Sequence, residues 1–283
     1  MSRIAFIFPG QGSQAIGMGK ELADAFPAAK AVFDEVDAAL GEKLSALIWG
    51  GSIEELTLTA NAQPALMAVS LAASRALEAG FGVKISTAAF VAGHSLGEYS
   101  ALAAAGAISV TDAARLLRKR GQAMQAAAPA GTGAMAALIG KVDLEIAEII
   151  ALEGSAAGTV VVANDNNVGN VVISGTKAGV EAAIAVAKTK GVKAISLPVS
   201  APFHSPLMAP AAVEMEKALA AATINAPVIP VVANVTARPI SEPADIRRLL
   251  VEQVTGRVRW RESIQWMAAG ADQNGGSVTK FVE

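Results

Sequence analysis

The sequence predicts an α/β protein in which a second, smaller unit is inserted into a larger one. Short apolar runs typical of buried strands lead through glycine-containing turns into helical segments at residues 3–26 and 87–106. Between residues 134 and 198 the expected elements follow the order β-α-β-β-α-β, which is the order of a ferredoxin-like fold. With 283 residues, 53% of them hydrophobic, the chain is long enough to bury a core for both units.

Composition excludes several classes of protein. The chain contains no cysteine, so it has no disulfides and no thiolate nucleophile or metal ligand, and we expect neither a metal nor a cofactor. Its net charge of -2 argues against nucleic acid as a partner. No apolar run approaches the ~18 residues of a membrane span, and the apolar N-terminal segment is too short for a signal peptide. We therefore expect a cytoplasmic protein without a membrane partner.

The first predicted strand, residues 3–8, is followed by a glycine-rich loop at 9–14 and a helix at 18–26. This loop is similar to a dinucleotide-binding fingerprint, but that fingerprint needs a second strand ending in an acidic residue about 20 residues later. Residues 28–49 instead predict one helix, with Asp37 among the acidic residues of its polar face. The loop is better suited to present backbone N–H groups to a developing oxyanion.

The second predicted strand, residues 87–92, and a helix at 98–106 flank the sequence Gly93-His94-Ser95-Leu96-Gly97. A G-x-S-x-G motif between a strand and a helix is typical of a nucleophile elbow, in which the serine occupies a strained turn. Ser95 is therefore the candidate nucleophile, although the five-residue pattern alone fits an ordinary turn serine equally well. Further helices are predicted at residues 61–79, with Asn61 as a cap, 111–128, 207–222, 243–254 and 260–269, and strands at 227–234 and 278–283.

The inserted unit is predicted to span residues 131–198, which leaves residues 1–130 and 199–283 for the larger unit. Residues 164–167 are rich in asparagine and are expected to form the loop of a polar hairpin. The other predicted elements of the insert are strands at 134–139, 159–163, 170–174 and 192–198 and helices at 143–153 and 177–190.

The chain has only two histidines, His94 and His204. His94 precedes Ser95 on the strand side of the elbow, where its side chain should point away from the serine. His204 lies on a proline-bracketed loop, and a base from far along the chain is the usual way to activate a serine. We therefore expect His204 to be the general base. The carboxylates between Ser95 and His204 fall mostly on predicted helices or in the insert, so no third member of a triad is evident and a dyad is the open alternative.

Five segments, in the same order along nearly the whole chain, resemble the malonyl-CoA:acyl carrier protein transacylase family. They are GQGSQ at 10–14, GHSLGEYSAL at 93–102, KRGQAMQ at 119–125, SAPFHS at 200–205, and VEQV at 251–254 followed by RVRW at 257–260. The resemblance implies an α/β-hydrolase-like core with a mainly parallel sheet and a ferredoxin-like subdomain. It also implies ping-pong transfer of malonyl through a serine ester.

The resemblance also implies catalytic roles. Ser95 would be the acylated nucleophile, and His204 its general base and acid. The backbone N–H groups of Gln11 and Leu96 would form the oxyanion hole. The backbone carbonyl of Gln253 would orient the histidine in place of an acid.

Arg120 is implied to bind the malonyl carboxylate, because arginine forms bidentate, charge-assisted pairs with carboxylates, worth ~1.5–3 kcal/mol. From the residues alone, Arg120 fits a solvated basic helix face equally well. Phe203 resembles the bulky residue of malonyl-selective members, and its ring would crowd an α-methyl group. Met124 and Met135 either line the same pocket or belong to the core, and His94 is also assigned to the substrate pocket.

We therefore expect transfer of malonyl from malonyl-CoA to the phosphopantetheine thiol of an acidic acyl carrier protein, for fatty acid biosynthesis. The enzyme is expected to be a monomer that docks the carrier through basic residues near the cleft. The alternatives left open are a serine hydrolase or thioesterase, in which water ends the same acyl-enzyme, and a trans-acting polyketide acyltransferase. A non-enzymatic module that binds carrier proteins is a further alternative.

Overall fold

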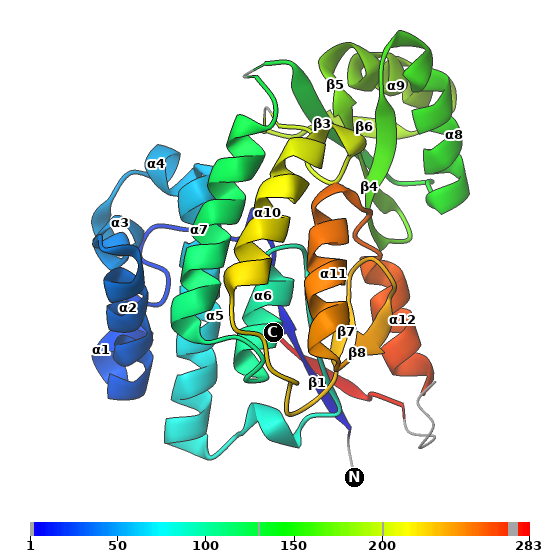
Figure 1. The fold of residues 1–283 in the computed structure, drawn as a ribbon. Helices are drawn as coiled ribbons and strands as arrows, with labels where there is room; N and C mark the ends of the chain where they lie inside the picture. The colour runs from blue at the N-terminus through cyan, green and yellow to red at the C-terminus, as the bar shows by residue number, and fades with distance from the viewer. Residues whose placement is uncertain (1–2, 130, 200, 271–276) are drawn as a thin grey trace.

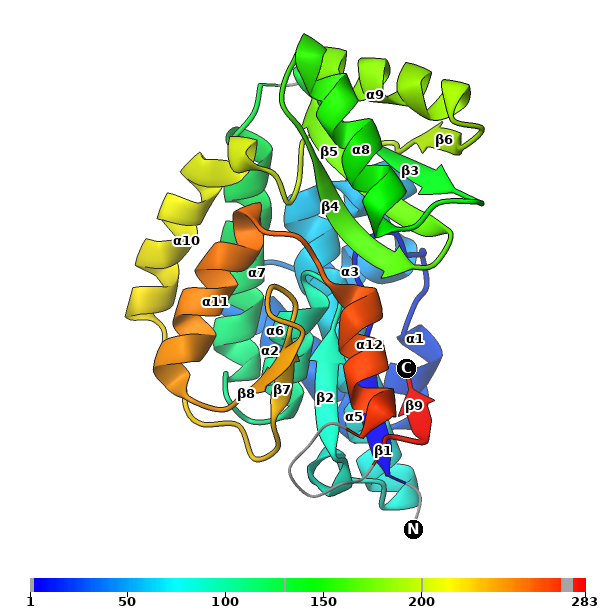
Figure 2. The ribbon, with the colours of Figure 1, turned by 90° about the vertical axis from the view of Figure 1, so that its right-hand side faces the viewer.

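The computed structural model describes residues 3–129, 131–199, 201–270 and 277–283, and their strands form two separate sheets (Figures 1 and 2). The strands of the larger sheet are β1 (Ile4–Phe8), β2 (Phe90–Gly93), β7 (Val231–Ala233), β8 (Arg238–Ile240) and β9 (Lys280–Val282). They lie in the order β8-β7-β2-β1-β9. All neighbouring strands are parallel except β7 and β8, which confirms the mainly parallel sheet.

Helices cover both faces of the larger sheet, as a parallel sheet requires. Alternate strand residues, Phe6 and Val91 among them, point into the main core formed with the helices on one face. Their neighbours Ala5 and Phe90 point to the other face, where they meet Met267. The helices of the larger unit are α1 (Lys20–Ala25), α2 (Pro27–Leu40), α3 (Leu44–Gly50), α4 (Ile53–Thr57), α5 (Thr59–Phe81), α6 (Gly97–Ala104), α7 (Val110–Ala126), α10 (Ala209–Ala221), α11 (Pro243–Thr255) and α12 (Trp260–Ala269).

The prediction of a single helix over residues 28–49 is wrong. The helix breaks at Gly41, which has a left-handed φ of 66°, a conformation in which glycine often ends helices. Asp37 is buried and does not lie on a polar face. Its carboxylate accepts hydrogen bonds from the backbone N–H and the hydroxyl of Ser45, at 2.9 and 2.7 Å, and so ties α2 to α3.

The structure also corrects the predicted start of one helix and the predicted strands near residue 230. Asn61 is not a helix cap, because α5 already begins at Thr59 and the Asn61 amide donates to the carbonyl of Glu55. The short strand β8 was not predicted, and β7 covers only the last part of the strand expected at 227–234.

The smaller sheet confirms the predicted β-α-β-β-α-β order. Its elements are β3 (Gly133–Ile139), α8 (Leu144–Gly154), β4 (Val160–Asn167), β5 (Asn170–Thr176), α9 (Lys177–Thr189) and β6 (Lys193–Ser196). The strands pair antiparallel in the order β4-β5-β3-β6. Residues 164–167, expected as a loop, belong to β4, where two register shifts interrupt the pairing with β5.

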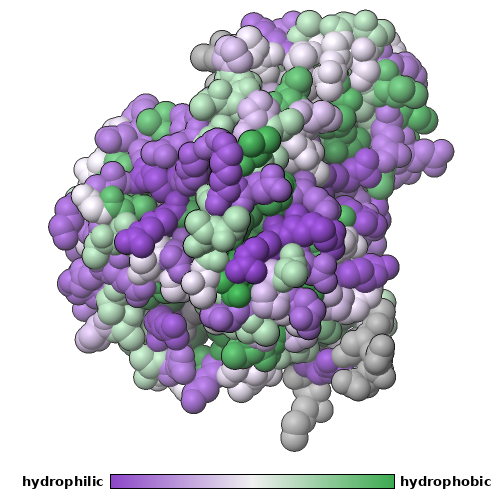
Figure 3. All heavy atoms as spheres, in the orientation of Figure 1, coloured by the Kyte–Doolittle hydropathy of each residue, from purple (hydrophilic) through white to green (hydrophobic). Residues whose placement is uncertain are grey.

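The two faces of the smaller sheet have different partners. One face packs on α8 and α9 around Leu138 and Ile173. The opposite face, with Met135 and Val172, meets Phe203 of the larger unit. In the space-filling view the smaller unit forms a separate upper lobe (Figure 3). We propose that residues 131–198 and the remainder are separate domains; the adjoining Ala130 and Ser200 lie outside the described residues.

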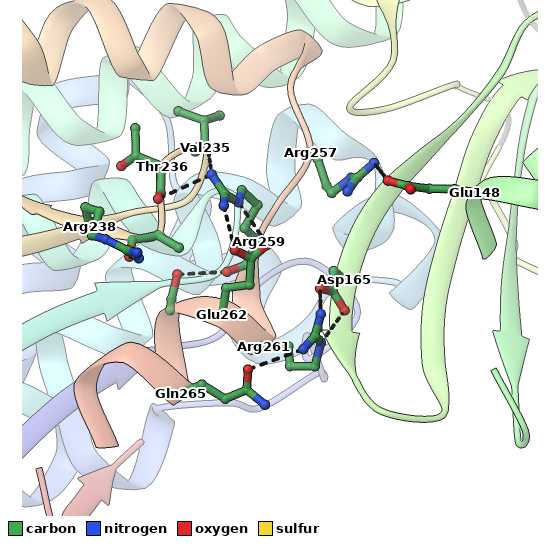
Figure 4. A network of polar contacts seen from close by, with 12 residues as sticks. Glu148, Asp165, Val235, Thr236, Arg238, Arg257, Arg259, Arg261, Glu262 and Gln265 are labelled. Carbon is green, nitrogen blue, oxygen red and sulfur yellow. Dashed lines mark hydrogen bonds and ion pairs between the residues drawn. The ribbon is translucent and has the colours of Figure 1, made fainter. Parts of the chain in front are cut away.

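The end of β4 is joined to the segment between α11 and α12 (Figure 4). The backbone N–H of Asp165 donates to the carbonyl of Val258 at 2.9 Å, and the N–H of Val258 donates to the carbonyl of Ala163 at 2.8 Å. Arg261 on α12 binds the buried carboxylate of Asp165 through Nε and Nη2, with a shortest distance of 2.7 Å. Arg257 in the same segment donates to the carbonyl of Val162 at 3.4 Å and binds the exposed Glu148 of α8 at 2.7 Å. This junction connects the smaller sheet to the larger unit.

Candidate active site

A cavity of about 350 Å³ lies between the two units. Every site residue predicted from the sequence except Gln253 lines it. They are Gln11, His94, Ser95, Leu96, Arg120, Met124, Phe203 and His204. The wall contributed by the smaller sheet includes Met135, Ala137, Asn164, Asn166, Asn170 and Val172. The cavity therefore gathers residues from both units around the elbow.

The elbow itself has the strained geometry that its motif predicts. Ser95 follows β2 with a φ of 54°, a left-handed conformation that is uncommon for a residue with a side chain. A Cβ at Gly93 would lie 1.8 Å from the carbonyl oxygen of Gly97, and one at Gly97 would lie 2.5 Å from that of Phe8. Only glycine fits at these two positions, and the close approach of strand and helix leaves Ser95 at the edge of the cavity.

His204 lies next to Ser95 although 109 residues separate them, and its Nε2 is 2.8 Å from the serine Oγ. The other ring nitrogen, Nδ1, is 2.9 Å from the backbone carbonyl of Gln253 and 3.1 Å from that of Gly256. Because carbonyls only accept, Nδ1 carries the proton and Nε2 is free to accept one from the serine. Burial and the nearby charge of Arg120 lower the pKa of His204 to about 3, so the ring is neutral at pH 7.

Arg120 is buried, with 1% of its surface exposed, so the alternative of a solvated helix face is wrong. Its Nη1 donates to Oε1 of Gln63 at 2.8 Å, and its Nη2 donates to Oε1 of Gln253 at 2.9 Å and to Oγ of Ser95 at 3.2 Å. All three partners are neutral, and no carboxylate among the described residues forms an ion pair with this guanidinium. Glu98 acts on its charge without forming an ion pair with it. A buried cation that no carboxylate contacts is costly, and it favours an anionic ligand in the cavity.

The other predicted residues are placed as follows. Met124 is buried and also lines the cavity, so the structure supports both of its predicted environments. Phe203 is half-buried between the main core and the smaller sheet. The ring of His94 contacts Asn166 at 2.9 Å through Nε2 and lies edge-on to Trp260.

Sequence reasoning did not assign three residues that hold the site together: Gln63, Glu98 and Asn234. Asn234 accepts a hydrogen bond from the backbone N–H of Ser95 at 2.7 Å and donates one to the carbonyl of Gly93 at 2.7 Å. Its position was the available signal, since it directly follows a strand of the parallel sheet at the carboxyl edge, where binding sites gather. Glu98 is one of the carboxylates between Ser95 and His204, and it forms no hydrogen bond or ion pair with His204.

An elbow serine with a neutral histidine beside it, on a mainly parallel sheet, is typical of enzymes that transfer acyl groups through a serine. Residues 5–278 match the family described as "Acyl transferase domain". The chain belongs to the malonyl-CoA:acyl carrier protein transacylase family.

Relatives of both kinds, curated sequences and solved structures, support this assignment. The malonyl CoA-acyl carrier protein transacylase of Bacillus subtilis is 51% identical over 100% of this chain and 86% of its own length. The crystal structure of the acyl-carrier-protein-S-malonyltransferase of Bartonella henselae is 56% identical, with a TM-score of 0.92 over 95% of this chain and 86% of that one. A malonyl-transacylase in complex with a type II polyketide synthase acyl-carrier protein is 42% identical, with a TM-score of 0.90 over 94% and 85%.

Proposed function

We propose that this enzyme transfers malonyl from malonyl-CoA to the phosphopantetheine thiol of an acyl carrier protein, for fatty acid biosynthesis. One observation carries the proposal: the Oγ of Ser95 lies 2.8 Å from Nε2 of His204 and 3.2 Å from Nη2 of Arg120. An acyl group bonded to that oxygen has a base on one side and a buried cation on the other. Membership of the transacylase family supports the same function.

In the first half-reaction, His204 takes the proton of Ser95 as the serine oxygen attacks the thioester carbonyl of malonyl-CoA. The negative charge of the tetrahedral intermediate develops on the former carbonyl oxygen, where the backbone N–H groups of Gln11 and Leu96 stabilise it. The intermediate collapses, the C–S bond breaks, and coenzyme A leaves with the proton from His204. The product is a malonyl ester of Ser95.

The second half-reaction reverses these steps with a different thiol. His204 takes the proton of the phosphopantetheine thiol, and the sulfur attacks the ester carbonyl. The C–O bond to Ser95 breaks, and the serine oxygen recovers the proton from His204. The neutral state of His204 at pH 7 lets it begin each half-reaction as a base.

Arg120 supplies the preference for a charged acyl group. Its guanidinium would form a bidentate pair with the free carboxylate of malonyl, whereas acetyl leaves it with its neutral partners. Phe203 would disfavour methylmalonyl by crowding the α-methyl group, a discrimination that is worth only ~1–3 kcal/mol in an apolar pocket.

Intact-mass measurement after mixing the enzyme with malonyl-CoA, without carrier protein, tests the covalent step. A malonyl adduct is expected on the wild type and none on Ser95→Ala. Absence of an adduct from the wild type would contradict the transferase and favour a module that only binds carriers. An adduct that disappears with continuous release of coenzyme A would instead favour the hydrolase. Comparing carrier proteins from fatty acid and polyketide synthesis as acceptors then separates those two pathways.

The Arg120→Ala variant tests the carboxylate role. Transfer of malonyl should fall ~10- to 100-fold, because a charge-assisted hydrogen bond worth ~1.5–3 kcal/mol is lost, while acetyl transfer is largely kept. The measurement is kcat/KM with malonyl-CoA and with acetyl-CoA. Arg115→Ala is the matched control, since Arg115 lies exposed on the same helix and, among the described residues, donates only to the carbonyl of Ala39. Equal losses for both acyl groups would overturn the assignment.

The expected binding partner is inferred from the charge of the residues near the cavity mouth. We expect an acidic carrier protein to dock through basic residues near the cavity mouth, with no role for nucleic acid, and the enzyme to act as a cytoplasmic monomer. Among the described residues, no helix is both long and apolar enough to cross a bilayer. Transfer to the carrier should weaken as ionic strength rises, because salt screens charge pairs beyond ~10 Å at 0.1 M. Transfer rates that do not respond to salt would contradict this docking mode.

A further inference from the structure

A buried carboxylate that takes no part in the proposed mechanism lies directly beneath the elbow. Glu98, in the first turn of α6, is 1% exposed. Its Oε2 accepts hydrogen bonds from Nε2 of Gln253 at 2.7 Å and from the backbone N–H of Asn234 at 3.1 Å. Its Oε1 has no hydrogen-bond partner among the described residues. Burying an acidic group in this way is costly, so its position calls for a functional explanation.

The carboxylate determines which way the amide of Gln253 points. Because an ionised carboxylate only accepts hydrogen bonds, the Nε2 group of Gln253 must face Glu98. The amide oxygen of Gln253 then faces Arg120, where it accepts from Nη2 at 2.9 Å. A flipped amide would place its oxygen against the carboxylate and its NH₂ group against the guanidinium. Both contacts would be repulsive, so Glu98 and Arg120 together permit a single orientation.

The same carboxylate also supports the serine. Nε2 of Gln253 makes a second bond, to the backbone carbonyl of Ser95 at 2.9 Å. Asn234, whose backbone N–H binds Glu98, accepts from the backbone N–H of Ser95 through its side chain. Both polar groups of the strained serine backbone are thus held by residues that Glu98 holds in turn.

We propose that Glu98 is a positioning residue for acyl transfer: it holds the Gln253 amide so that the guanidinium of Arg120 faces the carboxylate of the acyl group on Ser95. This inference rests on the proposed malonyl transfer. Glu98 acts as a hydrogen-bond acceptor, and its Oε2 can accept whether the group is ionised or protonated. Burial raises its pKa to about 7, so both states are populated near neutral pH. In the protonated state the guanidinium of Arg120, which only donates, still requires the amide oxygen of Gln253 to face it.

Two substitutions separate the acceptor role from a general structural one. Glu98→Gln keeps an amide oxygen as acceptor for both donors, and its NH₂ group can occupy the place of the unpartnered Oε1. It should retain malonyl transfer within about threefold, since only the charge and not the hydrogen bonds is lost. Glu98→Met has a similar length but no strong acceptor. It leaves the backbone N–H of Asn234 unpaired and removes the shortest of the hydrogen bonds that Nε2 of Gln253 donates. It should lower kcat/KM for malonyl-CoA ~10- to 100-fold and reduce the ratio of malonyl to acetyl transfer ~10-fold.

The acyl-group ratio is the readout that a merely structural role would not change. If Glu98→Met lowers malonyl and acetyl transfer equally, or if Glu98→Gln is as damaging as Glu98→Met, the positioning role is wrong. If Glu98→Met does not fold, as judged by circular dichroism, Glu98→Asp withdraws the acceptor by one methylene and should reduce the same ratio. A wild type that forms no malonyl adduct would defeat the proposed function itself. A wild type that transfers malonyl, with unchanged ratios in these variants, would defeat only the role of Glu98.

Discussion

At the scale of single residues, His204 and Arg120 both contact the Oγ of Ser95, and no carboxylate among the described residues forms a hydrogen bond with His204. The two carbonyls at Nδ1 hold the ring of His204 and select its tautomer. A carboxylate in their place would stabilise the protonated ring more strongly, but it would also bring a negative charge close to Arg120. That charge would compete with the acyl carboxylate for the guanidinium. Neutral carbonyls orient the base and leave the cation available.

This arrangement predicts a specific pH dependence of acylation. Burial, then the charge of Arg120, lowers the pKa of His204 to about 3, and His94 adds a smaller effect in the same direction. The wild type should therefore keep its base neutral, and its acylation rate with acetyl-CoA nearly constant, as pH falls from 7 to 5. In Arg120→Ala the second cause is removed, so the pKa rises and the acid limb moves to higher pH. Because burial remains, that limb should stay below the ordinary histidine value of about 6.5.

Single-turnover acylation by acetyl-CoA, followed by intact mass across pH 4 to 8, makes the measurement without depending on malonyl binding. The Arg115→Ala profile should superimpose on that of the wild type. An acid limb at the same pH in the wild type and in Arg120→Ala would show that the arginine does not influence the base.

At the scale of elements, some helices and strands could be predicted from local sequence patterns, whereas others depend on contacts between residues far apart in the chain. The helices α7, α9 and α11 and the order of the smaller sheet follow from local periodicity. In the structure Ser109 caps α7 by accepting from the N–H of Asp112, which is a local signal of the same kind. The break at Gly41 and the strand β8 depend on partners elsewhere: Asp37 reaches Ser45, and β8 has three residues paired only with β7.

The same distinction applies to the site. Ser95 could be predicted because it lies in a G-x-S-x-G motif, and His204 because the chain has only two histidines. Gln63, Glu98 and Asn234 could not, because their hydrogen bonds join residues 57, 155 and 139 positions apart. A side-chain amide or carboxylate that acts only through such contacts leaves no local pattern in the sequence.

The packing of α7 on α5 positions Arg120, and Gly121 makes it possible. A Cβ at Gly121 would lie 2.5 Å from Cα of Ala60 and 2.6 Å from the carbonyl oxygen of Thr59, both backbone atoms. Helix propensity alone would make Gly121→Ala more stable by ~1 kcal/mol. Overpacking against the backbone of α5 should outweigh this and destabilise the protein by a net ~1–2 kcal/mol. It should also raise KM for malonyl-CoA, because Arg120 moves with the helix.

Urea unfolding measures the effect. Gly50→Ala is the matched control: Gly50 is also helical and exposed, and a Cβ there meets no atom within 4 Å. This variant should be unchanged or slightly more stable. A Gly121→Ala protein as stable as Gly50→Ala would show that the two helices can separate at no cost.

At the scale of the whole molecule, docking of the smaller unit and orientation of the base share one short segment. Gln253 and Gly256 supply the carbonyls that hold His204. A few residues further on, Val258 binds the end of β4 through its backbone, and Arg261 binds Asp165 there (Figure 4). The wall of the cavity contributed by the smaller sheet is therefore connected to the residues that hold His204 by only a few residues of chain. A displacement of that wall would therefore shift the position of His204.

Loss of the Arg261–Asp165 ion pair at this junction should lower the free energy of unfolding far more than loss of the neighbouring Arg257–Glu148 pair. The side chain of Asp165 is 1% exposed and Arg261 is its only side-chain partner among the described residues, whereas Glu148, which Arg257 binds, is 52% exposed. Arg261→Met would leave a buried carboxylate unpaired and should lower the free energy of unfolding by ~3 kcal/mol. The control Arg257→Met should change it by less than ~1 kcal/mol. Urea unfolding gives both values, and amide hydrogen exchange should show faster opening of β4 in Arg261→Met alone. If both variants were equally stable, the docking of the smaller unit would have to depend on the backbone bonds of Val258 and the apolar contacts of Phe203 rather than on this buried charge pair.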